Sequence, residues 1–236
     1  MSMKDTRSTQ GIVVRQGEKS LYSRLHRSLA RFVLWLFRVR VRYPEREPGE
    51  DTTYLLCSNH ISAIDPLLIA AAVSHRQAHF MGKKELFRIP ILGGLFRTLG
   101  AYPVDRAGDI GAIKTSLSLL EQGTCVGMFP QGTRCKGKTP RESADKVKNG
   151  AGLLCDKTHV SVLPVCLKTK NNRLRVFRRV ELIFGELVPY QTLAERAPDE
   201  VSADTTAHGR QAEYARISHA IFERICALYE EDDHAK

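Results

Sequence analysis

The chain has 236 residues, which is long enough to bury a substantial core, and we expect one domain with a short appendage. Its 36 Lys and Arg residues outnumber 26 Asp and Glu, and the net charge of +10 favours contact with an anionic membrane, nucleic acid or a phosphorylated or acidic substrate. The 6 cysteines are dispersed singly, without a Cys-x-x-Cys pair. This excludes a disulfide framework and a cysteine zinc site, and it predicts reduced, mostly buried thiols.

The N-terminal region divides into two parts. Residues 1–19 are polar and charged, so we expect them to be disordered and to hold no signal peptide. Over residues 20–42, apolar side chains recur at spacings of three and four while arginines fall on another face, which predicts a basic amphipathic helix. Either the helix lies in a membrane interface, or it packs on the core with a solvated face. We favour the membrane because Trp35 suits an interface, although the apolar run 32–37 is too short to span a bilayer.

From residue 50 onward, short apolar runs alternate with helical patterns, after a linker marked by Pro44, Pro48 and Gly49. The predicted strands are 53–58, 78–81, 101–105, 124–129, 160–167, 173–179 and 181–188. The predicted helices are 66–75, 84–99 in two pieces, 110–122, 148–157 and 208–231, and 132–147 is predicted as a loop. This order predicts an α/β domain over residues 50–236, with a mixed sheet flanked by helices.

The chemistry is centred on residues 57–66, where a predicted strand ends just before His60, and Asp65 follows five residues later. On one helix these two side chains would point about 140° apart, so they meet only if the helix begins between or after them. A histidine held by an aspartate can take a proton from a hydroxyl. The alternative is structural, because Asp65 and Pro66 also form a good helix start.

Two further strands end near arginines that could bind a phosphate. Arg106 follows the strand at 101–105, and Arg134 follows a glycine turn at Gly132. An arginine fork can engage two phosphate oxygens, and amides freed by a glycine turn can add donors. Taken singly, each arginine is better explained as a surface charge or a salt-bridge partner than as a phosphate ligand.

Residues 132–139 also match the G-x-x-x-x-G-K-[ST] expression for a nucleotide-binding loop. Such a loop must lead into a helix with an apolar face. Residues 140–149 offer only Ala144 and Val147 to form that face. We therefore exclude a nucleotide site here.

Together, in order and spacing, these motifs resemble the glycerolipid acyltransferase family, in particular the PlsC-like bacterial 1-acyl-glycerol-3-phosphate acyltransferases. The similarity covers roughly residues 50–190. The matching motifs are Asn59-His60-x4-Asp65, a lysine block at residues 83–86, residues 100–106, residues 129–134, and Pro164 between apolar residues. One departure lies in the third motif, where Gln131 replaces the usual glutamate. Because an amide cannot supply a carboxylate, we expect Gln131→Glu to be at least as active as the parent.

The resemblance implies direct acyl transfer, with His60 as general base and Asp65 orienting it. Lys83, Arg106, Thr133 and Arg134 would bind the acceptor phosphate, and Asn59, Gly132 and Gln131 would support the site. The acceptor would be 1-acylglycerol-3-phosphate, the donor acyl-CoA or acyl-carrier protein, and the product phosphatidic acid. No metal or cofactor is required. We also expect the protein to lie at the cytoplasmic face of an anionic membrane as a peripheral or monotopic protein.

Two alternatives stay open at this point, and a third is weak. The enzyme could take another lysolipid acceptor, or the chain could bind membranes without catalysis. Nucleic-acid binding is motivated by net charge alone and lacks a recognisable module, so we expect no nucleic-acid partner.

Overall fold

The structure is a computed structural model that describes residues 28, 30–90, 93–94, 97, 100–104, 109–195 and 207–234. The predicted disordered segment 1–19 lies outside the described residues, as do most of the first half of the helix predicted at 20–42 and Arg106.

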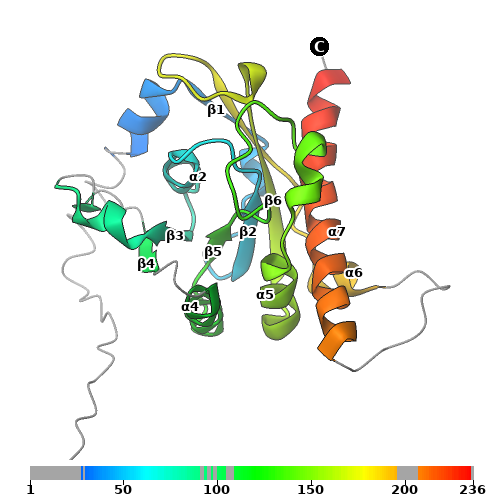
Figure 1. Ribbon diagram of the computed structural model, residues 1–236. Helices are drawn as coiled ribbons and strands as arrows, with labels where there is room; N and C mark the ends of the chain where they lie inside the picture. The colour runs from blue at the N-terminus through cyan, green and yellow to red at the C-terminus, as the bar shows by residue number, and fades with distance from the viewer. Residues whose placement is uncertain are drawn as a thin grey trace, which may run out of the picture.

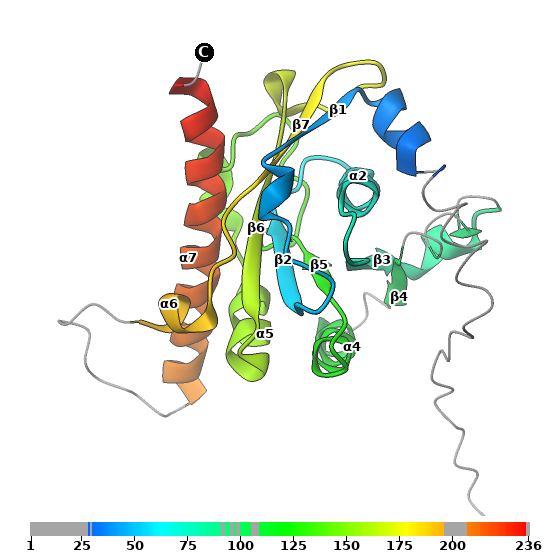
Figure 2. The ribbon, with the colours of Figure 1, turned by 180° about the vertical axis from the view of Figure 1, so that it is seen from behind.

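A seven-stranded sheet forms the centre of the fold, in the order β1-β7-β6-β2-β5-β3-β4 (Figures 1 and 2). The strands are β1 (Val39–Arg42), β2 (Tyr54–Ser58), β3 (His79–Lys83), β4 (Tyr102–Val104), β5 (Val126–Met128), β6 (Ser161–Thr169) and β7 (Val180–Phe184). The neighbours from β6 to β4 are parallel, whereas β7 runs antiparallel to β6 and β1 pairs in parallel with β7. The predicted α/β fold with a mixed sheet is confirmed.

Helices cover both faces of this sheet. They are α2 (Asp65–Ala72), α4 (Asp109–Glu121), α5 (Gly150–Thr158), α6 (Tyr190–Ala194) and α7 (Ala207–His234), with short 3-10 helices η1 (Pro44–Arg46), η2 (Lys84–Arg88), η3 (Arg141–Lys146) and η4 (Lys170–Asn172). The helical residues 30–36 and α2 lie on one face, and α4, α5 and α7 lie on the other (Figures 1 and 2). Among the helices that the structure describes, none combines the length and the apolar character needed to cross a membrane.

Strand β2 shows how the sheet is buried from both sides. Tyr54 and Leu56 belong to the core on the α2 face, whereas Leu55 and Cys57 belong to the core on the face of α5 and α7. Successive side chains of a strand point to opposite faces, so a strand covered on both faces is apolar throughout. This is why β2 appears in the sequence as a continuous apolar run.

The C-terminal end of the helix predicted at 20–42 is wrong. Residues 30–36 are helical, but Val39–Arg42 form the edge strand β1, which pairs with β7 from Val39↔Val180 to Arg42↔Ile183. Arg38 turns the chain between the two elements with a φ of 45°, in the left-handed region that ends a helix. Beyond that turn, valine and arginine alternate with the period of two that suits a strand.

The strand predicted at 173–179 is also wrong. This segment is an exposed connection between η4 and β7. Phe177 has a φ of 61°, which is incompatible with an extended strand, and Asn171 and Asn172 just before the segment have φ values of 57° and 48°. Only Leu174 of residues 173–177 is even partly buried, so little apolar contact favours a strand there.

Candidate active site

Three of the sequence motifs meet at one edge of the sheet. β2, β5 and β3 are parallel neighbours, so the residues that follow them emerge at their common carboxyl edge. These residues are His60 to Asp65 after β2, residues 129–134 after β5, and Lys83 at the end of β3. In open α/β sheets, ligands bind outside the carboxyl ends of the strands. The fold therefore creates a candidate site at this edge.

His60 and Asp65 are in direct contact. Helix α2 begins at Asp65, so His60 lies in the turn before it, and His60 Nδ1 is 2.8 Å from Asp65 Oδ2. The same oxygen accepts the backbone N–H groups of Ile61 (2.6 Å) and Ser62 (2.7 Å). Because a carboxylate only accepts, the Nδ1 atom of the neutral ring is the donor, and Nε2 carries the lone pair. This is the arrangement of a histidine base with an orienting aspartate.

Burial differs between the two partners of this pair. The Asp65 side chain is fully buried, whereas the His60 side chain keeps 17% of its surface exposed. Asp65 Oδ1 is buried and has no hydrogen-bond partner within the part of the chain that the structure describes. The aspartate therefore acts on His60 from inside the protein, and the imidazole is the member that reaches the surface of the site.

An aromatic ring supports the imidazole from the core. His60 stacks on Phe129, with ring centroids 4.1 Å apart and an interplanar angle of 17°, and Phe129 in turn lies 5.7 Å from Phe80. Phe129 belongs to the third sequence motif, but the motif alone gave it no role. Its contact with His60 depends on β5 lying next to β2, which the sequence does not reveal.

Gln131 holds the backbone of His60. Its Oε1 accepts the His60 N–H at 2.6 Å, and its Nε2 donates to Ser143 Oγ at 2.7 Å. Gln131 is 1% exposed, so both ends of the amide are used inside the protein. Sequence reasoning missed Ser143, because it lies on η3 within the predicted loop 132–147.

Arg141, the first residue of η3, joins this short helix to α7. The Arg141 guanidinium lies 2.6 Å from a carboxylate oxygen of Glu223 and 3.0 Å from one of Glu230. These are exposed ion pairs, which individually stabilise a protein little. Their position matters more, since they join the helix that carries Ser143 to the long helix α7.

Asn59 extends the contact between β2 and β6 beyond their ladder. Its Nδ2 donates to the Leu167 carbonyl at 2.9 Å, and its Oδ1 accepts the Leu167 N–H at 2.8 Å. The side chain is almost fully buried. Asn59 is therefore a supporting residue that fixes the chain immediately before His60.

The predicted phosphate-binding residues are only partly described. Thr133 and Arg134 are exposed and follow a turn at Gly132, which has a φ of 62°. This segment returns to the site, because Cys135 N–H donates to the His60 carbonyl at 2.7 Å. Lys83 ends β3, next to Val104 at the end of β4, but its side chain and Arg106 lie outside what is described. Phosphate binding by these four residues stays a prediction.

The nearby thiol does not compete as a nucleophile. Cys57 lies three residues before His60, but it is fully buried, and burial raises the pKa of its thiol well above the usual value. Reactive cysteines instead have a lowered pKa and some exposure. Across the described ranges, no three His, Cys, Asp or Glu side chains gather into a group that could hold a metal ion.

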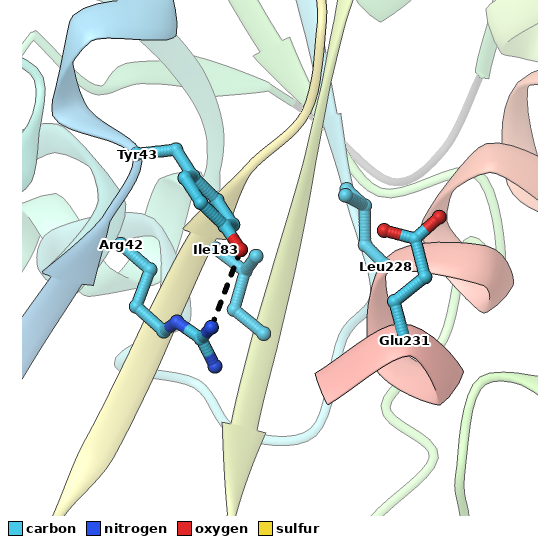
Figure 3. A pocket seen from close by; sticks show the side chains of 5 residues that line it. All are labelled: Arg42, Tyr43, Ile183, Leu228 and Glu231. Carbon is cyan, nitrogen blue, oxygen red and sulfur yellow. Dashed lines mark hydrogen bonds between the residues drawn. The ribbon is translucent and has the colours of Figure 1, made fainter. Parts of the chain in front are cut away.

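A separate pocket lies on the other face of the sheet (Figure 3). Its lining residues are Arg42, Tyr43, Ile183, Leu228 and Glu231. Ile183 and Leu228 belong to the core that faces α7, whereas the Phe129 ring beneath His60 packs against the core on the α2 face. This pocket is therefore not part of the candidate active site.

Two known proteins of the same name are similar to this chain. The 1-acyl-sn-glycerol-3-phosphate acyltransferase of Streptococcus pneumoniae is 29% identical over 212 residues, covering 86% of this chain and 75% of that protein. The enzyme of the same name from Bacillus subtilis is 29% identical over 151 residues, covering 63% of this chain and 72% of that protein.

A solved structure shares the fold. The crystal structure of the 1-acyl-sn-glycerophosphate acyltransferase PlsC from Thermotoga maritima has a TM-score of 0.59 and 22% identity, covering 91% of this chain and 85% of that one. Residues 38–168 match the model of the Acyltransferase family. This match spans more than half of the chain, which therefore belongs to the acyltransferase family.

Proposed function

We propose that this protein transfers a fatty acyl chain from acyl-CoA or acyl-carrier protein to the free hydroxyl of 1-acylglycerol-3-phosphate, giving phosphatidic acid. The observation that carries the proposal is the 2.8 Å contact between His60 Nδ1 and Asp65 Oδ2 at the carboxyl edge of the sheet. The names of the relatives point to the same acceptor.

The proposed reaction is a direct transfer. His60 Nε2 takes the proton of the acceptor hydroxyl while the hydroxyl oxygen forms a bond to the thioester carbonyl carbon. The carbon–sulfur bond then breaks, and the thiolate leaves with the proton from His60. Asp65 stabilises the imidazolium that exists between these two steps. A base in this position typically accelerates a reaction by about 10²–10⁴-fold.

Positioning of the acceptor is the second part of the proposal. Lys83, Arg106, Thr133 and Arg134 bind the phosphate, and this holds the hydroxyl near His60. The support is that Lys83 and the segment of Thr133 and Arg134 follow neighbouring parallel strands at the edge that carries His60. The enzyme works at the cytoplasmic face of a membrane, where its acceptor resides.

The function is tested with purified protein and both labelled donors against a panel of lysolipids. The proposal predicts transfer to lysophosphatidate in preference to lysolipids with a blocked phosphate, because the cations of the site bind a phosphate monoester best. Preferred transfer to another lysolipid would replace the acceptor. Absence of transfer with every pair of substrates, from a folded protein, would leave a protein that binds lipid without catalysis.

The phosphate-binding role is tested with Arg134→Ala. Loss of a charge-assisted hydrogen bond of about 1.5–3 kcal/mol should lower kcat/KM for lysophosphatidate by about 10–150-fold. We expect most of this loss in the KM of the acceptor, with the KM of the acyl donor unchanged. Arg224→Ala, an exposed arginine of α7, is the control. An unchanged acceptor KM in Arg134→Ala would remove this residue from the phosphate site.

A further inference from the structure

Large apolar side chains gather on the outside of the protein, from two segments far apart in the sequence. Phe32 and Trp35 of the helical residues 30–36 are 55% and 65% exposed, and Phe177 of the connection before β7 is 59% exposed. The Trp35 ring lies 6.0 Å from that of Phe32 and 6.1 Å from that of Phe177. Figures 1 and 2 show this yellow connection beside the blue helix. Contiguous exposed apolar surface of this kind marks an interaction site.

The two segments are joined by backbone as well as by ring contacts. The Phe177 N–H donates to the Leu36 carbonyl at the end of the helix, at 3.0 Å. Phe177 itself has a φ of 61°, a left-handed conformation that is uncommon for a bulky residue. The connection is therefore fixed in a shape that presents the ring to solvent next to Trp35.

A cationic cleft lies on the same connection. It encloses about 480 Å³ of space open to solvent, and the described residues that line it are Thr169, Lys170, Asn171, Arg173, Arg175 and Arg178. Four of these six carry a positive charge and none is acidic. Over the ranges that the structure describes, no ion pair is formed by any of the four cations. Their charge is available to an anionic partner.

Both features lie at the edge of the sheet that carries His60. β6 is parallel to β2, so the connection that begins after Thr169 emerges on the same side as the turn after Ser58. The Gly137 N–H also donates to the Asn172 carbonyl at 2.9 Å, which joins the loop after β5 to this connection. A partner bound here lies at the same edge of the sheet as His60.

We propose that Phe32, Trp35, Phe177, Lys170, Arg173, Arg175 and Arg178 form an aromatic-basic surface that docks on an anionic lipid membrane. The aromatic rings enter the interfacial layer, and the cationic cleft receives the phosphates of lipid headgroups. An acidic protein would satisfy the cations but would leave three exposed aromatic side chains without an apolar partner. The inference rests on the proposed function, since the acceptor is itself a lipid, and it adds the connection at residues 170–178 to the membrane contact predicted for the N-terminal helix.

The full-length protein is tested on phosphatidylcholine vesicles with and without phosphatidylglycerol. Trp35 is the only tryptophan of the chain, so its emission reports directly on the aromatic-basic surface. We expect a blue shift on vesicles that contain phosphatidylglycerol. Arg175→Gln with Arg178→Gln should weaken binding to these vesicles by about 30-fold, because each basic residue near an anionic surface contributes about fivefold.

Two control variants separate charge at this surface from net charge. Arg175→Lys with Arg178→Lys keeps the charge and should bind within about threefold of the parent, because attraction to an anionic surface depends on charge rather than on the guanidinium shape. Lys114→Gln with Arg210→Gln removes two exposed charges from α4 and from the start of α7 and should also bind nearly as the parent does.

Three results would overturn the inference. These are unchanged Trp35 emission on vesicles that bind the protein, equal vesicle binding by the two glutamine double variants, and arginine-dependent binding of an acidic carrier protein without vesicle binding. Vesicle binding is measured without turnover, so a protein that binds in this way but transfers no acyl chain would refute the proposed function and leave the docking surface intact. Conversely, a protein that transfers acyl chains to lysophosphatidate in detergent micelles but does not bind vesicles would refute only the docking surface.

Discussion

His60 is fixed through its main chain as well as through its ring. Its N–H donates to Gln131 Oε1, its carbonyl accepts the Cys135 N–H at 2.7 Å, and its Nδ1 contacts Asp65. Phe129 covers one face of the ring. These contacts suit the base that we propose, because small displacements of such a group are costly in rate.

The contacts of Gln131 reverse our expectation for Gln131→Glu. The Gln131 amide donates to Ser143 Oγ, whose own hydrogen points to the carbonyl of Thr139 (2.9 Å) or Pro140 (3.1 Å). A carboxylate cannot donate, so the hydroxyl would have to turn away from these carbonyls, and a charge would be buried. We expect Gln131→Glu to be less stable by about 1–3 kcal/mol and to turn over more slowly.

Urea unfolding and initial rates of acyl transfer measure these two effects. Ser143→Ala provides the matched comparison, because it removes the acceptor of the amide. It should destabilise the parent by leaving the buried Gln131 amide N–H without an acceptor, and its combination with Gln131→Glu measures the coupling between the two residues. Parent-like stability and activity in Gln131→Glu would show that the amide has no role of its own.

At the scale of the elements, the Asn59 side chain links β2 to β6 just beyond the last backbone pair of the two strands. The ladder closes at Ser58↔Val165, and Asn59 then continues the pairing with two hydrogen bonds to the Leu167 backbone. His60 follows directly. These two hydrogen bonds fix the point at which the chain leaves the sheet and enters the turn that carries His60.

Asn59→Ala should destabilise the fold by about 2–4 kcal/mol, because it leaves the buried N–H and C=O of Leu167 without partners. Urea unfolding measures the free energy. Asn149→Ala is the control, since Asn149 is half-buried and bonds to Gln211 near the surface, and it should change stability by about 0.5 kcal/mol or less. A loss in Asn59→Ala no larger than in this control would mean that the Asn59 bridge is unimportant.

The sequence predicts the buried elements better than the exposed ones. The runs at 53–58 and 160–167 lie close to β2 and β6, since strands buried on both faces are apolar throughout. β1 was missed because a helical pattern runs directly into it, and its strand character depends on pairing with β7, far away in the sequence. The strand predicted at 173–179 failed for the opposite reason, because its residues have almost no core to pack against.

The whole molecule brings the motifs together through parallel strand order. The motifs at 59–65 and 129–134 follow strands, and Lys83 ends one, so a parallel sheet places them at one edge, and this much can be predicted from the sequence. The sequence does not give the order of the strands. It therefore could not show that Phe129 lies against His60, that Ser143 holds Gln131, or that Phe177 meets Trp35.

The central claim is that His60 is the base of an acyl transfer, and its most direct test is the initial rate of phosphatidic acid formation by His60→Ala at saturating donor and lysophosphatidate. His219→Ala, which removes an exposed histidine of α7, is the control, and thermal melting checks that both variants are folded. We predict a fall of about 10²–10⁴-fold for His60→Ala and a parent-like rate for His219→Ala. A folded His60→Ala protein that forms phosphatidic acid as fast as the parent would contradict the account.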